Sequence, residues 1–274
     1  MLSINTNLGA MVALQYLNKT NNDLTETQTR INTGLKVAGP KDNGAVFAIA
    51  QNMRGSVAGY QAITDNLNRG ISTVDVAISA GQSISDLLTE MKAKTLAAAD
   101  TSLDTSSRNA LNQDFVGLRD QITTIVQNAS FNGSNLVDGS LTNLQFLAST
   151  DGTKRITVDG QALGLSGTIV TITSGSTINS QASASTMISV IDSSIQNVNS
   201  ALAKLASGAK KFTIQNDFVG KLMDTLNAGI GNLVDADMAV ESAKLQALQV
   251  KQQLGVQALS IANSAPSITL SLFR

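Results

Sequence analysis

The segment 233–264, LVDADMAVESAKLQALQVKQQLGVQALSIANS, decides how the chain is expected to fold. At 100° per residue, its apolar residues form two stripes on opposite sides of a predicted helix. One stripe is Met238, Leu245, Leu248, Val256 and Leu259, and the other is Val240, Ala243, Ala247, Val250, Leu254, Ala258 and Ile261. A surface helix needs one apolar face, so this helix is expected to be covered on both sides. The cover comes either from a single domain that surrounds the helix or from further copies of the chain.

Polar residues mark the start of this predicted helix. Asn232 is expected to cap its first turn, and Asp235 and Asp237 lie where the positive end of the helix dipole favours carboxylates. That position explains both acids without a carboxylate dyad or a metal site. We therefore expect no catalytic and no metal-binding residues here.

Residues 6–35 are the obvious partner for this helix. Their seam residues follow a three-four spacing: Ala10, Leu14, Leu17, Asn21, Leu24, Gln28, Ile31 and Leu35. The spacing predicts a heptad helix with two polar interruptions. Together the two segments are expected to form a terminal coiled coil.

Further helical patterns fill most of the remaining chain. Gly39-Pro40 ends the first pattern, and Asp42 or Asn43 can cap the next helix. That helix, over about 44–99, would be roughly 80 Å long at 1.5 Å per residue. Other helices are predicted after the Ser/Thr-rich break at 101–107 and again from about 182. We expect 44–139 plus 181–230 to form a helical stem domain.

The periodicity changes between these stem segments. Turn dipeptides such as Asn132-Gly133 and Asp151-Gly152 flank three β-prone runs, 144–147, 155–158 and 168–173. They predict a short β-rich variable region at 140–180. The expected fold class is mainly α, an elongated antiparallel helical bundle and terminal coiled coil with a small β-hairpin region.

Composition excludes several classes of function. The chain has no His and no Cys, which rules out His-dependent triads, thiol nucleophiles and thiolate zinc sites. A net charge of −1 without any basic run excludes the electrostatics of nucleic-acid binding. No apolar run approaches the ~20 residues of a membrane span, and no Sec-type signal is readable. We expect no enzyme activity, no cofactor and no membrane insertion.

The two ends of the chain closely resemble those of bacterial flagellins. The amino-terminal match consists of Ser3 to Asn7, Arg30 to Val37 and Lys41 to Ala45, and Phe131-Asn132-Gly133 is similar to a flagellin turn. The carboxyl-terminal match is Lys251 to Asn263, followed by Leu270 to Arg274. The resemblance spans roughly 1–139 and 181–274. It is most similar to short flagellins of alphaproteobacterial type.

This resemblance implies a subunit that self-assembles into the flagellar filament for swimming motility. It implies export through a type III channel, an extracellular location, and an export chaperone, a filament cap and hook-associated proteins as partners. The inner-tube domain would be 1–35 plus 233–274. Its expected contact residues are Leu14, Leu17, Leu24, Ile31, Met238, Leu245, Leu248, Leu254, Val256, Leu259 and Ile261. The alternatives are a hook-filament junction protein and a flagellin-like cell-surface adhesin.

The resemblance also bears on immune recognition. The helix that the vertebrate flagellin receptor recognises reads Leu-Gln-Arg-Val-Arg-Glu in the family. The corresponding residues here are Leu88, Thr89, Glu90, Met91 and Lys92, followed by Ala93. A glutamate replaces a positive charge, so we expect weak receptor activation.

Overall fold

The computed structural model describes residues 6–271, with side chains as far as Ser264. The chain divides into two compact units. A terminal unit contains the chain up to Val57 and from Asp224 onward, and a central unit contains Ala58–Met223. The motif residues Ser3 to Asn5 and the final Phe273-Arg274 lie outside the described residues.

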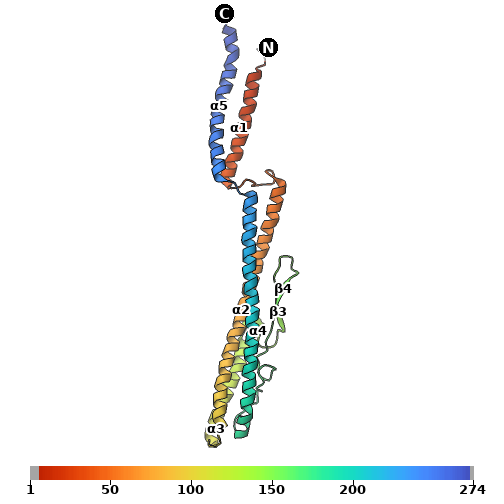
Figure 1. Cartoon of the computed structure of the whole chain (residues 1–274), viewed down its shortest axis with the longest axis vertical. Coiled ribbons are helices and arrows are strands. Elements are labelled where there is room, and N and C mark those ends of the chain that lie inside the picture. Colours follow the sequence, from red (N-terminus) through yellow and green to blue (C-terminus); the bar gives the residue numbers. More distant parts are fainter. Residues whose placement is uncertain (1–5, 272–274) are drawn as a thin grey trace. The chain divides into compact units, whose positions relative to one another are not determined.

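In the terminal unit, α1 (Leu8–Thr33) and α5 (Met238–Ser271) lie side by side (Figure 1). The Asn7 side chain caps α1 by accepting from the N–H of Ala10. Gly34 ends α1 with a φ of 71°, a left-handed conformation that glycine adopts without strain, and its N–H donates to the Arg30 carbonyl. The predicted terminal helix pair is therefore present.

The last helix begins later than the sequence pattern predicts. Residues 232 and 233 belong to the end of α4 (Gln181–Val234), so Asn232 is not the cap of α5 and that prediction is wrong. Asp237 takes this role, because its Oδ1 accepts from the N–H groups of Ala239 and Val240 at 2.9 and 3.2 Å. A short bridge between Leu35 and Asp235 joins the end of α1 to the connection before α5.

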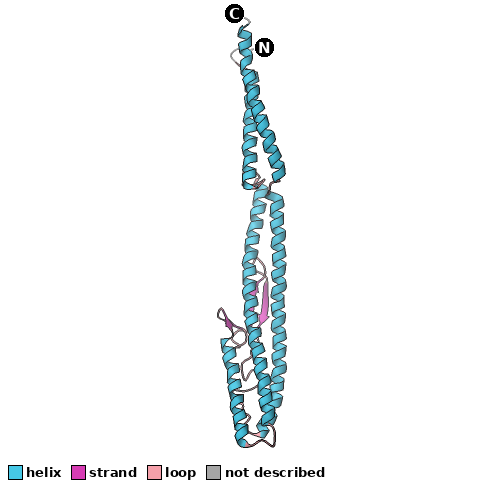
Figure 2. Cartoon of the chain, turned by 90° about the vertical axis from the view of Figure 1, so that its left-hand side faces the viewer, coloured by secondary structure: helices cyan, strands magenta, loops and turns pink. Residues whose placement is uncertain are grey.

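The central unit is built on α2 (Gly44–Ala98), α3 (Thr105–Asn128) and α4, which Figure 2 shows side by side. Their buried faces follow helical spacing and share one core. The largest fully buried side chains on these helices are Leu67, Ile84, Leu88, Met91, Phe115, Ile122, Ile191 and Phe212. The expected long helices and helical bundle are confirmed.

The side chains of residues that precede α2 and α3 cap these two helices. Asn43 caps α2 and Asp104 caps α3, each accepting from a backbone N–H three residues on. Arg108 bonds the carbonyls of Ala98 and Asp100 at 2.9 Å and so satisfies acceptors at the end of α2.

Two small antiparallel hairpins follow α3. In the first, β1 (Ser130–Phe131) pairs with β2 (Ser134–Asn135) across Asn132 and Gly133, whose φ values of 48° and 78° suit a two-residue turn. In the second, β3 (Asn143–Leu147) pairs with β4 (Arg155–Asp159). The expected hairpin at 144–158 is thus confirmed.

The third β-prone run, 168–173, is not a strand. Val170 and Ile172 are fully buried in the helical core. The N–H of Thr171 donates to the Ser194 side chain on α4 at 3.1 Å instead of to a neighbouring strand. The alternation in the sequence reflects this burial against helices.

The compact units divide the chain at other points than the expected domains. The β3–β4 hairpin packs into the central unit, where Phe146 meets Phe212 of α4 edge to face with ring centroids 5.2 Å apart. Residues 44–57 and 224–230, expected in the stem, belong to the same compact unit as the terminal helices. They share a small core of Val37, Ala50, Ile230 and Val234.

Candidate self-association surfaces

The contact between α1 and α5 uses one face of each helix. The half-buried or buried residues are Ala10, Ala13, Leu17, Thr20, Asn21, Asp23, Leu24, Thr27, Arg30 and Ile31 on α1, and Glu241, Leu245, Leu248, Gln252, Gly255, Leu259 and Ala262 on α5. Among the described residues of both helices only Thr27, Glu241 and Leu248 are buried outright. This contact face, called the seam below, therefore buries few side chains completely.

The opposite face of α5 is exposed in the part of the chain that the structure describes. Its large apolar residues are well exposed: Val240 59%, Val250 55%, Leu254 58% and Ile261 71%. Ala243, Ala247 and Ala258, the small members of the same predicted stripe, are exposed as well.

The other predicted stripe of α5 divides between the two environments. Leu245, Leu248 and Leu259 face α1, but Met238 and Val256 are 43% and 54% exposed. The face of α5 that contacts α1 contains Glu241, Gln252 and Gly255 and does not contain these two residues. Counting apolar residues alone misses these polar and glycine positions.

The outer face of α1 is also apolar. Leu8 is 73% exposed, Met11 65%, Tyr16 68%, and Leu14 47%. Leu17, Leu24 and Ile31 lie in the seam as half-buried residues, whereas Leu14 points away from it.

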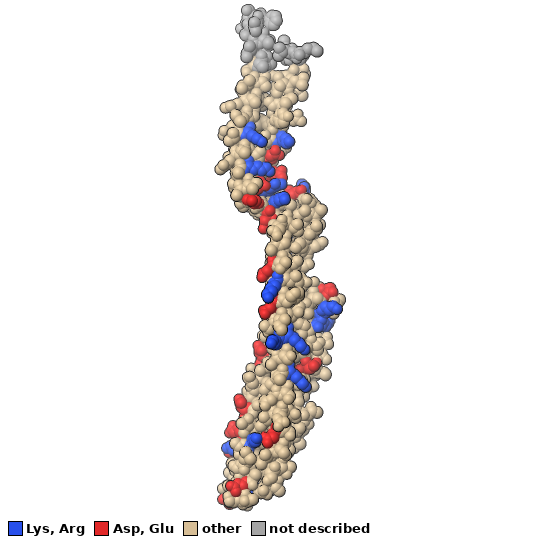
Figure 3. All heavy atoms as spheres, viewed as in Figure 1, with Lys and Arg blue, Asp and Glu red and all other residues tan. Residues whose placement is uncertain are grey.

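Charge is absent from the parts of these helices that carry Leu8, Met11 and Tyr16 on α1 and Leu254 and Ile261 on α5. No Asp, Glu, Lys or Arg occurs in α1 before Lys19 or in α5 after Lys251. In Figure 3 the described ends of the two helices are uncharged accordingly. Exposed apolar side chains without interspersed charges are typical of a surface that becomes buried in a complex.

The central unit has a smaller exposed apolar pair. Ile214 and Phe218 lie four residues apart on α4 and are 59% and 57% exposed. The predicted receptor helix belongs to α2, where Leu88 and Met91 are core residues and Thr89 and Glu90 are exposed.

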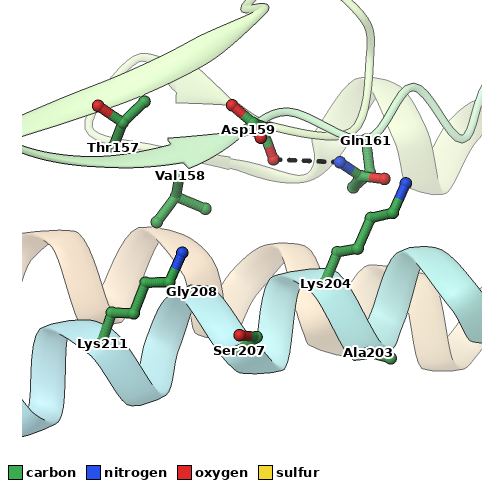
Figure 4. Close-up of a pocket in the computed structure, with 9 residues that line it drawn as sticks. All are labelled: Thr157, Val158, Asp159, Gln161, Ala203, Lys204, Ser207, Gly208 and Lys211. Carbon is green, nitrogen blue, oxygen red and sulfur yellow. Dashed lines mark hydrogen bonds between the residues drawn. The ribbon is translucent and has the colours of Figure 1, made fainter.

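A groove of about 350 Å³ lies along the contact between β4 and α4 (Figure 4). Lys204 and Lys211 border it on α4, and Asp159 lies at the end of β4. These three charged residues are exposed, and no buried acid or base is among the nine lining residues. Such a groove offers no desolvated group for acid-base chemistry.

The resolved shifts of carboxyl pKa values in the described chain come from caps and turns, and that of Lys94 comes from an ion pair. Hydrogen bonds from Ser107 lower the pKa of Asp104, the cap of α3, and Ser102 does the same for Asp100. The nearby Asp114 raises the pKa of Lys94. Residues 6–271 contain no group of three or more metal-ligating side chains, and none of their helices is long and apolar enough to traverse a bilayer.

Comparison with known proteins agrees with this arrangement. Residues 4–142 match the bacterial flagellin N-terminal helical region, and residues 188–273 match the bacterial flagellin C-terminal helical region. The fold is similar to that of a flagellar hook-associated protein from Vibrio parahaemolyticus, with a TM-score of 0.58 and 16% identity over 71% of this chain and all of that one.

Curated relatives match over nearly the full length. Flagellin FljK of Caulobacter vibrioides is 55% identical, covering 99% of this chain and 98% of its own. A flagellin of Brucella melitensis is 35% identical over the whole of both chains. The chain therefore belongs to the bacterial flagellin family, a family of structural proteins that polymerise. It is a subunit of the flagellar filament, of the kind found in alphaproteobacteria.

Proposed function

We propose that the terminal unit carries the main polymer contacts, with 1–35 and 233–274 forming the inner tube of the filament. The observation that supports this is the pair of exposed apolar faces on the uncharged parts of α1 and α5. In the polymer these faces pack against neighbouring copies, while the opposite faces hold the two helices together.

The energetics favour such burial. Full burial of one Val, Leu, Ile or Met side chain contributes about 1.5–3 kcal/mol. Several such residues are exposed on each helix, against a typical domain stability of about 5–15 kcal/mol. Contacts with neighbouring copies therefore rival the stability of the folded subunit itself.

Ile214 and Phe218 on α4 provide a second contact in this proposal, between central units of adjacent copies. The subunit performs no catalysis, and its place of work is the extracellular filament. Its further partners are an export chaperone, the filament cap and hook-associated proteins.

Seeded polymerisation followed by electron microscopy tests the proposal. Leu254→Asp replaces an exposed apolar residue of α5 by a charge, so the monomer stays folded and filament formation is lost. Asn143→Asp adds the same charge to the exposed start of β3 and is the control that still polymerises. Filaments from the Leu254→Asp variant at the parent concentration would contradict the proposed face.

The same experiment separates the alternatives. Long straight or coiled filaments from the parent chain are expected for a filament subunit. A hook-filament junction protein or an adhesin would give none after seeding.

Weak recognition by the vertebrate flagellin receptor is a further part of the proposal. Glu90 is exposed on α2, and the neighbouring Lys92 is engaged in an ion pair with Asp192 of α4 at 2.6 Å. Reporter cells should respond more weakly to this chain than to a recognised flagellin, and Glu90→Arg should strengthen the response.

A further inference from the structure

We propose that polar contacts spaced along the seam set the register in which α1 and α5 pair. Three of the polar contacts between described residues lie near the two ends and in the middle of the seam. They join Asn7 to the Ala262 carbonyl, Gln252 to Asn21, and Arg30 to Glu241, at 2.6, 2.8 and 3.1 Å. The register belongs to the single chain, and only its effect on assembly rests on the proposed function.

The apolar residues of the seam do not define one register. Leu17, Leu24 and Ile31 recur every seven residues on α1. On α5, Leu245 and Leu259 are two heptads apart. A slide of one helix by seven residues therefore returns apolar side chains to apolar layers, as in any heptad pair.

The polar contacts do not tolerate such a slide. Seven residues correspond to about 10 Å along a helix, far beyond hydrogen-bond reach. The slide would leave the buried Glu241 carboxylate without Arg30 and would place the Asn21 amide opposite Leu245 or Leu259. Gln252 would face Leu14 in one direction and Gln28 in the other. The Asn7 contact is formed with a backbone carbonyl, which another residue would supply after a slide, so the two side-chain pairs are the contacts that select the observed register.

Buried polar groups also weaken the contact between α1 and α5. Thr27 Oγ1 and Glu241 Oε2 are buried side-chain atoms for which the described structure offers no hydrogen-bond partner. Apolar side chains at these two positions would hold the helices together more firmly. Thr27 and Glu241 are two of the three buried residues among the described side chains of the seam, and polar groups retained there fit a role in specificity, as a single buried polar residue has in coiled coils.

Register matters for the outer faces as well. The exposed residues Met11 and Tyr16 of α1 and Val250 and Leu254 of α5 belong to different helices. A slide by one heptad would move the exposed residues of α1 by about 10 Å relative to those of α5. The composite surface for a neighbouring copy would then be lost.

Disulfide trapping measures the register directly, because the chain has no cysteine of its own. A Cβ atom at Gly255 would lie 3.8 Å from the Cβ of Leu17. That separation matches the ~3.8 Å of a disulfide, so Leu17→Cys with Gly255→Cys reports the observed register. Leu17→Cys with Ala262→Cys, and Ala10→Cys with Gly255→Cys, report slides by one heptad in either direction.

In the otherwise unaltered full chain, kept monomeric by dilution, the first pair should oxidise fully and the two slide reporters hardly at all. Asn21→Leu with Gln252→Leu should raise cross-linking of a slide reporter by about fivefold, since the net contribution of one hydrogen bond is worth about that factor. Asn22→Leu with Gln253→Leu changes the exposed neighbours equally and should leave the pattern unaltered.

Circular dichroism checks that each variant is helical, and Asn21→Ala with Gln252→Ala replaces the leucine variant if that one does not fold. The exchange Asn21→Gln with Gln252→Asn keeps an amide pair and should keep the register. Unchanged trapping in both the leucine and the alanine variants would overturn the proposal and assign the register to the bridge between Leu35 and Asp235. None of these readouts depends on polymerisation, so they stand apart from the test of the filament contacts.

Discussion

Gly208 of α4 lies directly beneath Val158 of β4, and its lack of a side chain sets how closely the hairpin approaches the helix. A Cβ atom at this position would lie 2.9 Å from both methyl groups of Val158, which is itself buried. Gly208→Ala should therefore destabilise the protein by about 1–3 kcal/mol through overpacking. Chemical denaturation followed by circular dichroism measures the change.

Gly220 is the matched control on the same helix, because a Cβ atom there would meet nothing within 4 Å. Gly220→Ala should stabilise by about 0.5–1 kcal/mol from helix propensity alone. Val158→Ala should relieve the strain of Gly208→Ala. Equal stabilisation by both glycine substitutions would show that the hairpin does not press on α4.

Asp151, in the turn between β3 and β4, has the strongest resolved pKa shift of the described chain. The hydroxyl of Ser149 first, and then the hydroxyl and N–H of Thr153, lower its pKa to about 2. Because the pKa of Asp151 is lower in the folded chain, its ionised carboxylate stabilises the turn at any pH above the unfolded pKa of about 3.9. This stability is lost as the pH falls through about 2.

The turn should thus keep its structure on acidification from neutral pH to about pH 4. A carboxyl-carbon NMR titration of Asp151 should give a midpoint near 2, and Ser149→Ala should move it toward 3.8. An unchanged midpoint in the Ser149→Ala variant would contradict the assigned cause.

Among the elements, α5 has an observed cap, Asp237, that differs from the cap predicted from the sequence, Asn232. Asp237→Ala removes the side-chain acceptor for two backbone N–H groups and should cost about 1 kcal/mol of helix stability. Asp237→Asn should retain most of it. Amide hydrogen exchange across residues 238–245 is the sensitive measurement.

Asn232→Ala provides the control, because Asn232 is an exposed residue inside α4. It should leave exchange at the start of α5 unchanged. Greater loss of protection in Asn232→Ala than in Asp237→Ala would indicate that the last helix starts directly after Asn232, as the sequence pattern predicts.

The elements also show why the two-stripe pattern was informative and incomplete. Opposed apolar stripes in 233–264 predicted a helix with two buried faces, and one face does pack on α1 while the other is exposed in the single chain. The phase of the seam was not predictable from apolar residues, since Glu241, Gln252 and Gly255 fill seam positions. Their roles depend on Arg30, Asn21 and Leu17, partners more than 200 residues away.

At the scale of the whole molecule, the two units differ in how much they bury. The central unit has an extended core with many side chains fully excluded from solvent, whereas the described side chains of α1 and α5 include three buried ones. Helices with so little burial open easily, because most helical stability in proteins comes from packing.

Limited proteolysis of the monomer should therefore remove the ends first and leave a resistant fragment close to residues 58–223. In the assembled filament, where we propose that neighbouring copies cover the outer faces, the ends should resist cleavage. Mass spectrometry of the digests gives the boundaries. Equal protection of ends and centre in the monomer would show that the terminal helices are stable alone.

The sequence by itself determined the helices, the hairpin at 144–158, the exclusion of His- and Cys-based chemistry, and the family. These follow from local periodicity, turn residues and composition, which act over a few neighbouring positions. Only the tertiary structure decided that α5 starts at Met238, that 168–173 packs as a loop, and that polar residues occupy the terminal seam. The loop and the seam amides are defined by partners far away in the sequence. The start of α5 follows from where α4 ends, at Val234, whose carbonyl accepts from the distant N–H groups of Lys36 and Val37.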